Sequence, residues 1–396
     1  MEAAAATHRR PAWLVGLAPL AVLALAIGLF TALGAPGLDR TGVPVEELSV
    51  ERTTLRPGEI ELHVRNDGPD PVRVRQVIVN DGFAAFSQSD RELGRLDGGR
   101  IAMRYPWIEG ENYELLLVTA TGATIDHSIE AATETPDADL GFYGLMALIG
   151  LYVGIIPVAI GMLWLPWARG VDRRWMGFLL AFTVGLLAFL GLDALLEGSE
   201  IAGTGPEALG GAALVWLGAA AAYLALTWVD ARLSHGREGG SRGSTGFRAA
   251  FLVALGIGLH NLGEGLAIGA AYAIGSLALG ASLVVGFALH NTTEGLAIVA
   301  PVAREEGGRR RLARLAGLGL LAGAPAILGA WLGASAFHPS AAALMLGIGA
   351  GAIARVIVLI APAIRDERGR LLHGLAAAGL LTGLAVMYAT GLLVSV

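Results

Sequence analysis

Two stretches of sequence decide the fold: FLVALGIGLHNLGEGLAIGA at residues 251–270 and ASLVVGFALHNTTEGLAIVA at residues 281–300. Each is an apolar run that carries the phrase His-Asn-x-x-Glu-Gly, which begins at His260 in the first and at His290 in the second. Hydrocarbon is a poor solvent for imidazole and carboxylate, so such groups at membrane depth need a partner such as a metal ion. The repeated phrase therefore indicates a membrane protein with a polar site at its centre.

The composition points the same way. Of the 396 residues, 54% are hydrophobic and 16% are charged, and the mean hydropathy is +0.61. These values exceed the apolar share of an ordinary soluble domain. The absence of cysteine excludes disulfides, thiolate metal sites and cysteine catalysis. A net charge of -6 gives no reason to expect a nucleic-acid partner.

Apolar segments long enough to cross a bilayer follow one another after residue 139. They are residues 140–167, 175–197, 210–229, 249–275, 278–302, 313–336, 341–363 and 371–394. Arginines gather in alternate connecting loops, whereas loops such as 198–209 and 338–341 contain none. Because arginine-rich loops face the cytoplasm, we expect a multi-pass cell-membrane protein whose carboxyl terminus is extracytoplasmic.

The amino-terminal part, residues 1–36, is expected to hold a cytoplasmic terminus and an anchor helix. Arg9 and Arg10 precede an apolar run of about 21 residues, Trp13–Leu33, which can span a bilayer. We predict an uncleaved anchor, which makes nine spans in total. The alternative is a signal peptide cleaved near Ala35-Pro36-Gly37.

Residues 39–139 differ sharply from the rest, with 20 acidic and 10 basic residues. Alternating runs at 60–66, 72–80 and 113–119, separated by turn sequences such as NDGPDP and LDGG, predict a small extracytoplasmic β-sandwich. The wording RPGEIELHVRNDGPDPVRV resembles the early strands of cupredoxin or immunoglobulin-like domains. A copper site needs a thiolate, and this segment offers only His63, His127 and Met103. We expect a structural or protein-binding role, with metal donation as the alternative.

The repeated phrase places a nitrogen, an amide oxygen and a carboxylate toward one side of each helix, because residues i and i+4 differ by about 40° around the axis. Both histidines lie near the middle of consecutive, antiparallel spans. The two copies should therefore meet as an inverted pair near the midplane, where transporters commonly place substrate sites. Imidazole and carboxylate without thiolate suit Zn²⁺, Fe²⁺ or Mn²⁺. The candidate ligands are His260, Asn261, Glu264, His290, Asn291 and Glu294. The alternative is that these polar residues only hold membrane helices together.

HNxxEGLAIG followed thirty residues later by HNxxEGLAI resembles the fourth and fifth helices of the ZIP family of divalent metal transporters. The resemblance covers residues 140–396 and implies an all-α, eight-helix membrane bundle in which the six candidate ligands coordinate metal in transit, normally toward the cytoplasm. It also implies a carrier that is not an enzyme and has no resident cofactor, since the metal is the cargo. A homodimer is one candidate assembly, and the added β domain is a candidate site for a protein partner.

Three further positions are compared with the family pattern. Asp193 and Glu197, near the outer end of the second family helix, resemble the acidic residue at the entrance of the metal path; the alternative is a solvated helix end. Arg355 lies within the seventh family helix. It either snorkels toward the cytoplasmic face or acts as a fixed positive charge paired with Glu264 or Glu294, which would favour a single metal.

Two departures from the family pattern concern proline and glutamate. Many members carry proline before the motif glutamate, where this chain has Gly263 and Thr293, so the kink that opens each helix must come from glycine or local hydrogen bonding. Where the sixth helix often carries glutamate before proline, this chain has Ala324 before Pro325. One ligand of a possible second metal is therefore missing.

Three functions follow from the sequence, and metal transport is the principal prediction. No GxxxxGK[ST] motif is present, so ion gradients or the membrane potential must drive it. The alternatives are a non-transporting metal sensor that reports through the β domain and, less favoured, a membrane-embedded metal hydrolase. The hydrolase lacks an HExxH motif and an evident nucleophilic serine.

Overall fold

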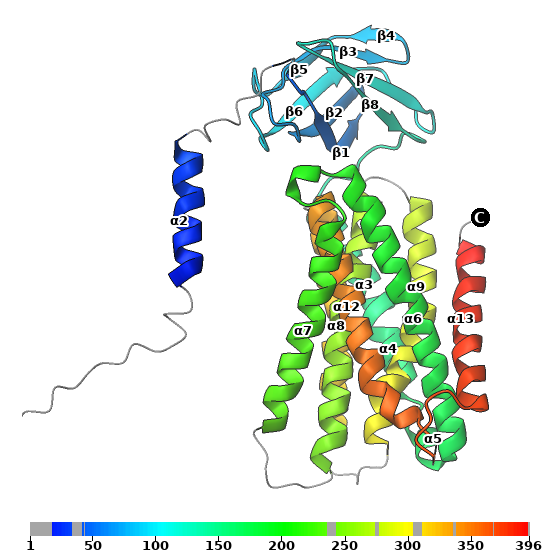
Figure 1. The fold of residues 1–396 in the computed structure, drawn as a ribbon. Helices are drawn as coiled ribbons and strands as arrows, with labels where there is room; N and C mark the ends of the chain where they lie inside the picture. Colours follow the sequence, from blue (N-terminus) through cyan, green and yellow to red (C-terminus); the bar gives the residue numbers. More distant parts are fainter. Residues whose placement is uncertain are drawn as a thin grey trace, which may run out of the picture. The chain divides into compact units, whose positions relative to one another are not determined.

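The computed structural model describes residues 18–33, 42, 44–235, 243–273, 277–303, 311–335, 338–366 and 368–394. The chain divides into two compact units, residues 1–44 and 45–396. In the first unit, helix α2 (Ala18–Ala32) has 15 apolar or small residues, and its described side chains are exposed (Figure 1). It covers most of the expected anchor; residues 13–17 and the candidate cleavage motif at 35–37 lie outside the described residues.

The second unit begins with two antiparallel four-stranded sheets, in the orders β1-β2-β6-β5 and β4-β3-β7-β8 (Figure 1). The strands are β1 (Leu48–Arg56), β2 (Glu59–Asn66), β3 (Val74–Val79), β4 (Gly82–Ala84), β5 (Phe86–Gln88), β6 (Gly98–Arg104), β7 (Tyr113–Thr119) and β8 (Thr124–Ile129). Alternate residues of β2 and β7 are buried, and Leu62 and Leu117 belong to one core that both sheets share. The β-sheet prediction is confirmed, and strands β2, β3 and β7 lie where the alternating runs placed them.

The three possible metal donors of this domain lie apart from one another and have other contacts. Met103 on β6 is part of the core and is 1% exposed. His127 Nε2 on β8 lies 2.8 Å from the hydroxyl of Thr53, and burial lowers the pKa of His127. His63 Nε2 on β2 lies 3.0 Å from the carboxylate of Glu61. These contacts give each side chain a role within the sandwich.

Within the described residues, eight helical segments are long and apolar enough to cross a membrane, and they match the eight apolar segments of the sequence. The first consists of α3 (Leu140–Gly150), the π-helix η1 (Leu151–Ile155), α4 (Ile156–Met162) and α5 (Leu165–Gly170). The others are α6 (Arg173–Thr204), α7 (Ala213–His235), α8 (Gly243–Ala273), α9 (Leu277–Val299) with the short η3 (Ala300–Val302), α10 (Arg311–Gly323) with α11 (Pro325–Ser335), α12 (Pro339–Ile364) and α13 (Gly374–Val394). A short 3₁₀ turn, η2 (Glu207–Leu209), connects α6 to α7.

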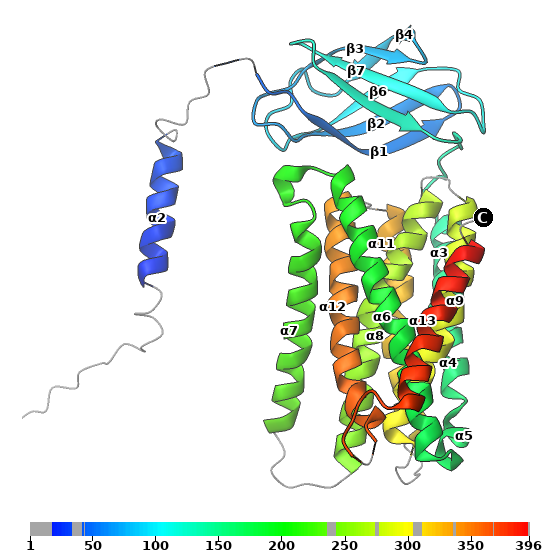
Figure 2. The same ribbon diagram turned by 45° about the vertical axis from the view of Figure 1, so that its right-hand side comes forward.

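These helices form a bundle in which α12 packs against α6, α7 and α8, while α8 also packs against α11 and α9 (Figure 2). Helix α13 packs on α6, and α4 packs on α9. The contact between α8 and α11 is backbone to backbone: a Cβ atom added to Gly265 would lie 2.1 Å from the Ala326 carbonyl oxygen, and one added to Gly329 would lie 2.1 Å from that of Leu262. Small residues of this kind let membrane helices approach closely.

The helices that carry the repeated phrase, α8 and α9, are continuous, whereas two spans that pack against them are interrupted. Helices α8 and α9 run without a break through Gly263 and Thr293, and the expected kink at these positions stays a prediction. Without proline there, both positions keep the N–H group that closes the helical ladder. The first span instead changes to a π-helix just before Pro157, and the sixth is interrupted between Gly323 and Pro325.

Candidate functional site

The six candidate ligands come from the middle of α8 and α9, and all of them are buried. The six residues are between 0% and 5% exposed. In each helix the Gly residue after the glutamate packs against a neighbouring backbone, on α11 for Gly265 and on α4 for Gly295. The close packing leaves the polar side chains with one another and with the backbone as partners.

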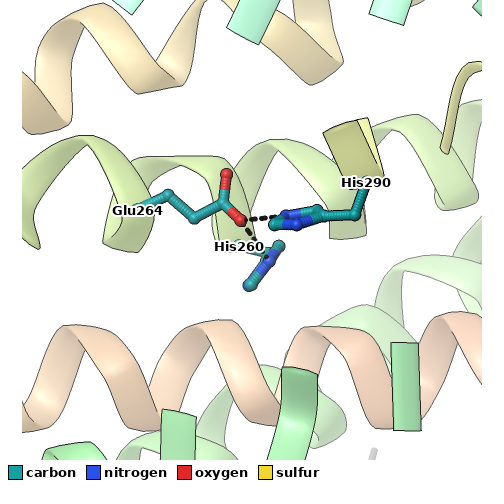
Figure 3. Close-up of side chains that lie close together, drawn as sticks. All are labelled: His260, Glu264 and His290. Carbon is teal, nitrogen blue, oxygen red and sulfur yellow. Dashed lines mark hydrogen bonds and ion pairs between the residues drawn. The ribbon is translucent and has the colours of Figure 1, made fainter. Parts of the chain in front are cut away.

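Glu264 is the centre of the group. Its Oε1 atom lies 2.5 Å from Nε2 of His290, with which it is hydrogen-bonded, and 2.9 Å from Nε2 of His260, a pair that meets by distance although Nε2 of His260 makes no hydrogen bond among the described residues (Figure 3). Possible ligand atoms of these three residues all lie within 4.8 Å of one another. Among the described residues this is the group of histidine and carboxylate side chains that could hold a metal ion.

The two asparagines flank this group and contact backbone carbonyls. Asn261 Nδ2 donates to the carbonyl of Ala322 at 3.0 Å. Asn291 Nδ2 donates to the carbonyl of Val153 at 3.1 Å and to Glu264 Oε2 at 2.9 Å. Both carboxamide oxygens are buried and have no hydrogen-bond partner among the described residues. The prediction that both copies of the phrase meet therefore agrees with the geometry.

Glu294 lies outside the tight group but is also buried, at 1% exposure. Neither of its carboxylate oxygens has a hydrogen-bond partner among the described residues, and the same is true of Nδ1 of His290. A buried carboxylate without a partner is costly in an apolar surrounding. Together with the free amide oxygens, it gives the interior several acceptors suited to a cation.

A small cavity connects this group to α6. Asp193 and Glu197 line it together with His260 and Glu264. Asp193 is exposed and Glu197 is half-buried. The structure thus places both acidic residues beside the cluster, and their role as an entrance stays a prediction.

Arg355 has a partner other than the one proposed from the sequence. Its Nη2 atom donates to Asp230 Oδ2 on α7 at 2.7 Å, and its guanidinium lies 6.0 Å from the ring centroid of Tyr223. Asp230 Oδ1 also lies 3.4 Å from Nε of Arg248 on α8. The alternative that Arg355 pairs with Glu264 or Glu294 is wrong, because its guanidinium contacts the carboxylate of Asp230 on the adjacent α7; that Arg355 snorkels toward the cytoplasmic face stays a prediction. The single-metal argument from Arg355 is lost with that pairing.

Sequence reasoning missed the carbonyls of Val153 and Ala322 and the role of Asp230. The available signals were Pro157, which lies inside the first apolar run, and Asp230, which directly follows the third. Either could have been noted as an exception to a uniform apolar pattern.

No family model and no curated protein matches the chain. Among solved structures, the chain is similar to the archaellum periplasmic stator protein FlaG from Sulfolobus acidocaldarius, with 13% sequence identity and a TM-score of 0.20. That match covers 22% of this chain and 100% of the other. A likeness with so low a TM-score carries no argument about this chain.

Proposed function

We propose that the chain carries divalent metal cations of the zinc, iron or manganese class across a membrane, into the cytoplasm. The observation that carries the proposal is the buried carboxylate of Glu264, shared by His260 from its own helix and His290 from the next. A polar cluster at the centre of apolar helices is expensive and is typically kept for a substrate or ion path. The cation is the substrate here, not a resident cofactor.

The chemistry of the donors supports a borderline divalent cation. Two imidazole nitrogens and carboxylate oxygens are ligands that zinc, ferrous and manganous ions accept. Glu264 and Glu294 together supply two negative charges, which can neutralise a dication where the dielectric constant is low. Asp193 and Glu197 would attract the hydrated ion toward the cavity before its water is removed.

The orientation of the path follows from the loop charges. If arginine-bearing loops are cytoplasmic, the amino terminus is inside, and the β domain and carboxyl terminus are outside. Asp193 and Glu197 then lie toward the outer end of α6, as an entrance requires. The resemblance of the repeated phrase to the ZIP family supports the same direction and an eight-helix transport domain at residues 140–396.

Uptake of radiolabelled zinc, iron or manganese into proteoliposomes tests the proposal. The double variant His260→Ala with His290→Ala should lose at least about tenfold in uptake, because both nitrogen donors are removed. His338→Ala is the matched control, since His338 is an exposed histidine at the start of α12, and it should transport like the wild type. Equal uptake by the double variant and the wild type would refute the proposal.

A variant lacking residues 1–139 separates transport from sensing. Intact uptake without these residues would make the β domain accessory to a carrier. Zinc binding by the full chain with no uptake of any of the three metals would instead favour the sensor.

A further inference from the structure

We infer that interruptions in the first and sixth spans orient the two asparagines, so that each keeps its carboxamide oxygen, and not its NH₂ group, free for the cation. The inference rests on the proposed function, since it concerns how the same site presents itself to cargo. It assigns positioning roles to Pro157 and Pro325, two residues that offer no ligand atom.

The first step concerns the carbonyl groups. A helical carbonyl normally accepts from the N–H four residues later, and proline has no N–H. Val153 lies in the π-helix η1 and precedes Pro157 by four residues, so the α-helical donor to its carbonyl is absent. Ala322 lies in the last turn of α10, where the helix is interrupted before Pro325. The last carbonyls of a helix need partners from elsewhere.

The second step concerns the amides. Asn291 Nδ2 donates to the Val153 carbonyl at 3.1 Å, and Asn261 Nδ2 donates to the Ala322 carbonyl at 3.0 Å. An amide oxygen in place of either Nδ2 would face a carbonyl oxygen at the same distance and be repelled. The carbonyls therefore decide which end of each amide they bind, and both Oδ1 atoms remain without a partner among the described residues.

The third step concerns the cation. A carboxamide offers a donor and an acceptor of nearly equal size, and only the acceptor can bind a cation. The NH₂ group of Asn261 is held by a backbone carbonyl, and that of Asn291 by a backbone carbonyl and by Glu264 Oε2, so both carboxamide oxygens are left as acceptors. The two contacts are also counterparts, because they involve the same position of the repeated phrase and an interrupted neighbouring span. An inverted pair of half-sites would be built in this way.

Asn261→Asp in the full chain tests the orientation. It adds a carboxylate, which as a simple ligand would tighten zinc binding, but it also places an oxygen where Nδ2 met the Ala322 carbonyl. We expect about tenfold weaker Zn²⁺ binding and a raised KM with little change in kcat, measured in lipid nanodiscs and proteoliposomes. Pro325→Ala returns an N–H group opposite the Leu321 carbonyl and lets the helix continue, so that the Ala322 carbonyl can accept from Ala326 instead of Asn261; it should weaken binding about fivefold.

Pro362→Ala is the matched control, because Pro362 also interrupts the ladder inside a helix, on α12, and should leave Zn²⁺ binding unchanged. The loss of Zn²⁺ affinity in Asn261→Asp combined with Pro325→Ala should be smaller than the sum of the losses in the two single variants. In Asn261→Asp combined with Pro157→Ala the two losses of affinity should add. If Pro325→Ala fails to fold, Pro157→Ala combined with Asn291→Asp replaces its pair and should likewise be less than additive. Asn261→Asp with equal or tighter binding, or additivity in both pairs, would overturn the inference. A wild type that binds no Zn²⁺ at all would instead sink the proposed function.

Discussion

Gly265→Ala is expected to separate α8 from α11 and to destabilise the protein. Its added Cβ would lie 2.1 Å from the carbonyl oxygen of Ala326, 2.8 Å from its carbonyl carbon and 2.9 Å from the nitrogen of Ala330. Carbon atoms in ordinary contact stand about 3.5 to 4.0 Å apart, so α11 must retreat by about 1 Å or more. Forcing extra volume into a packed contact costs about 1–3 kcal/mol.

Gly317→Ala is the matched control for this prediction. Gly317 lies within α10, and an added Cβ meets nothing within 4 Å. Because alanine is a better helix former, the control should be stabilised by up to about 1 kcal/mol. The two variants should therefore differ by about 1–4 kcal/mol although the chemical change is the same.

Unfolding of the wild type and both variants in one lipid or detergent measures the difference. Zinc uptake adds a functional reading, since Gly265 directly follows Glu264 and a displaced α8 would move that carboxylate relative to His290. Equal stability of the Gly265 and Gly317 variants would show that the backbones of α8 and α11 do not meet as described.

Three further predictions concern charge. Asp230→Asn should lower the free energy of unfolding by about 3 kcal/mol, because it leaves Arg355 and Arg248 without their shared carboxylate. Arg355→Met in the same background should restore most of that loss. Unfolding measurements that find Asp230→Asn as stable as the wild type would contradict this prediction. Glu294→Gln should lower zinc uptake about tenfold or more while leaving the unfolding temperature unchanged or raised, because it removes a buried carboxylate without a partner; unchanged uptake would contradict it. Burial lowers the pKa of His127, so as pH falls below about 6.5 the unfolded chain takes up a proton that the folded domain does not. Hydrogen-exchange protection of β8 should therefore decline with falling pH, and His127→Gln should reduce that decline. Protection of β8 that is independent of pH would contradict this prediction.

The spans and the meeting of the repeated phrases could be predicted because both depend on patterns within single segments. An apolar run of sufficient length predicts a helix long enough to cross a bilayer, whatever its neighbours are. His260 and His290 stand at similar depth in consecutive spans, so a short antiparallel connection brings them together. Strand β2 was equally readable, because its buried residues alternate along one sheet face.

The partners of the polar groups could not be predicted in this way. Arg355 could reach a carboxylate on any helix beside α12, and the sequence does not say that Asp230, 125 residues away, is the one that faces it. The π-helix before Pro157 is hidden for a similar reason, since an apolar run looks the same whether its turns contain four or five residues. Such choices depend on which helices pack together, and this information is spread over the whole chain.

The hydrogen bonds around Glu264 also bear on how readily cargo could leave. A cation departing from Oε1 would leave that oxygen to Nε2 of His290, which is hydrogen-bonded to it, and to the nearby imidazole of His260, while Asn291 continues to hold Oε2. The carboxylate thus exchanges one set of partners for another and never stands bare in an apolar surrounding. Rapid turnover requires binding that is weak enough to reverse. Under the proposed function, side chains that capture the ion also compete with it, and this competition would favour a carrier over a storage site.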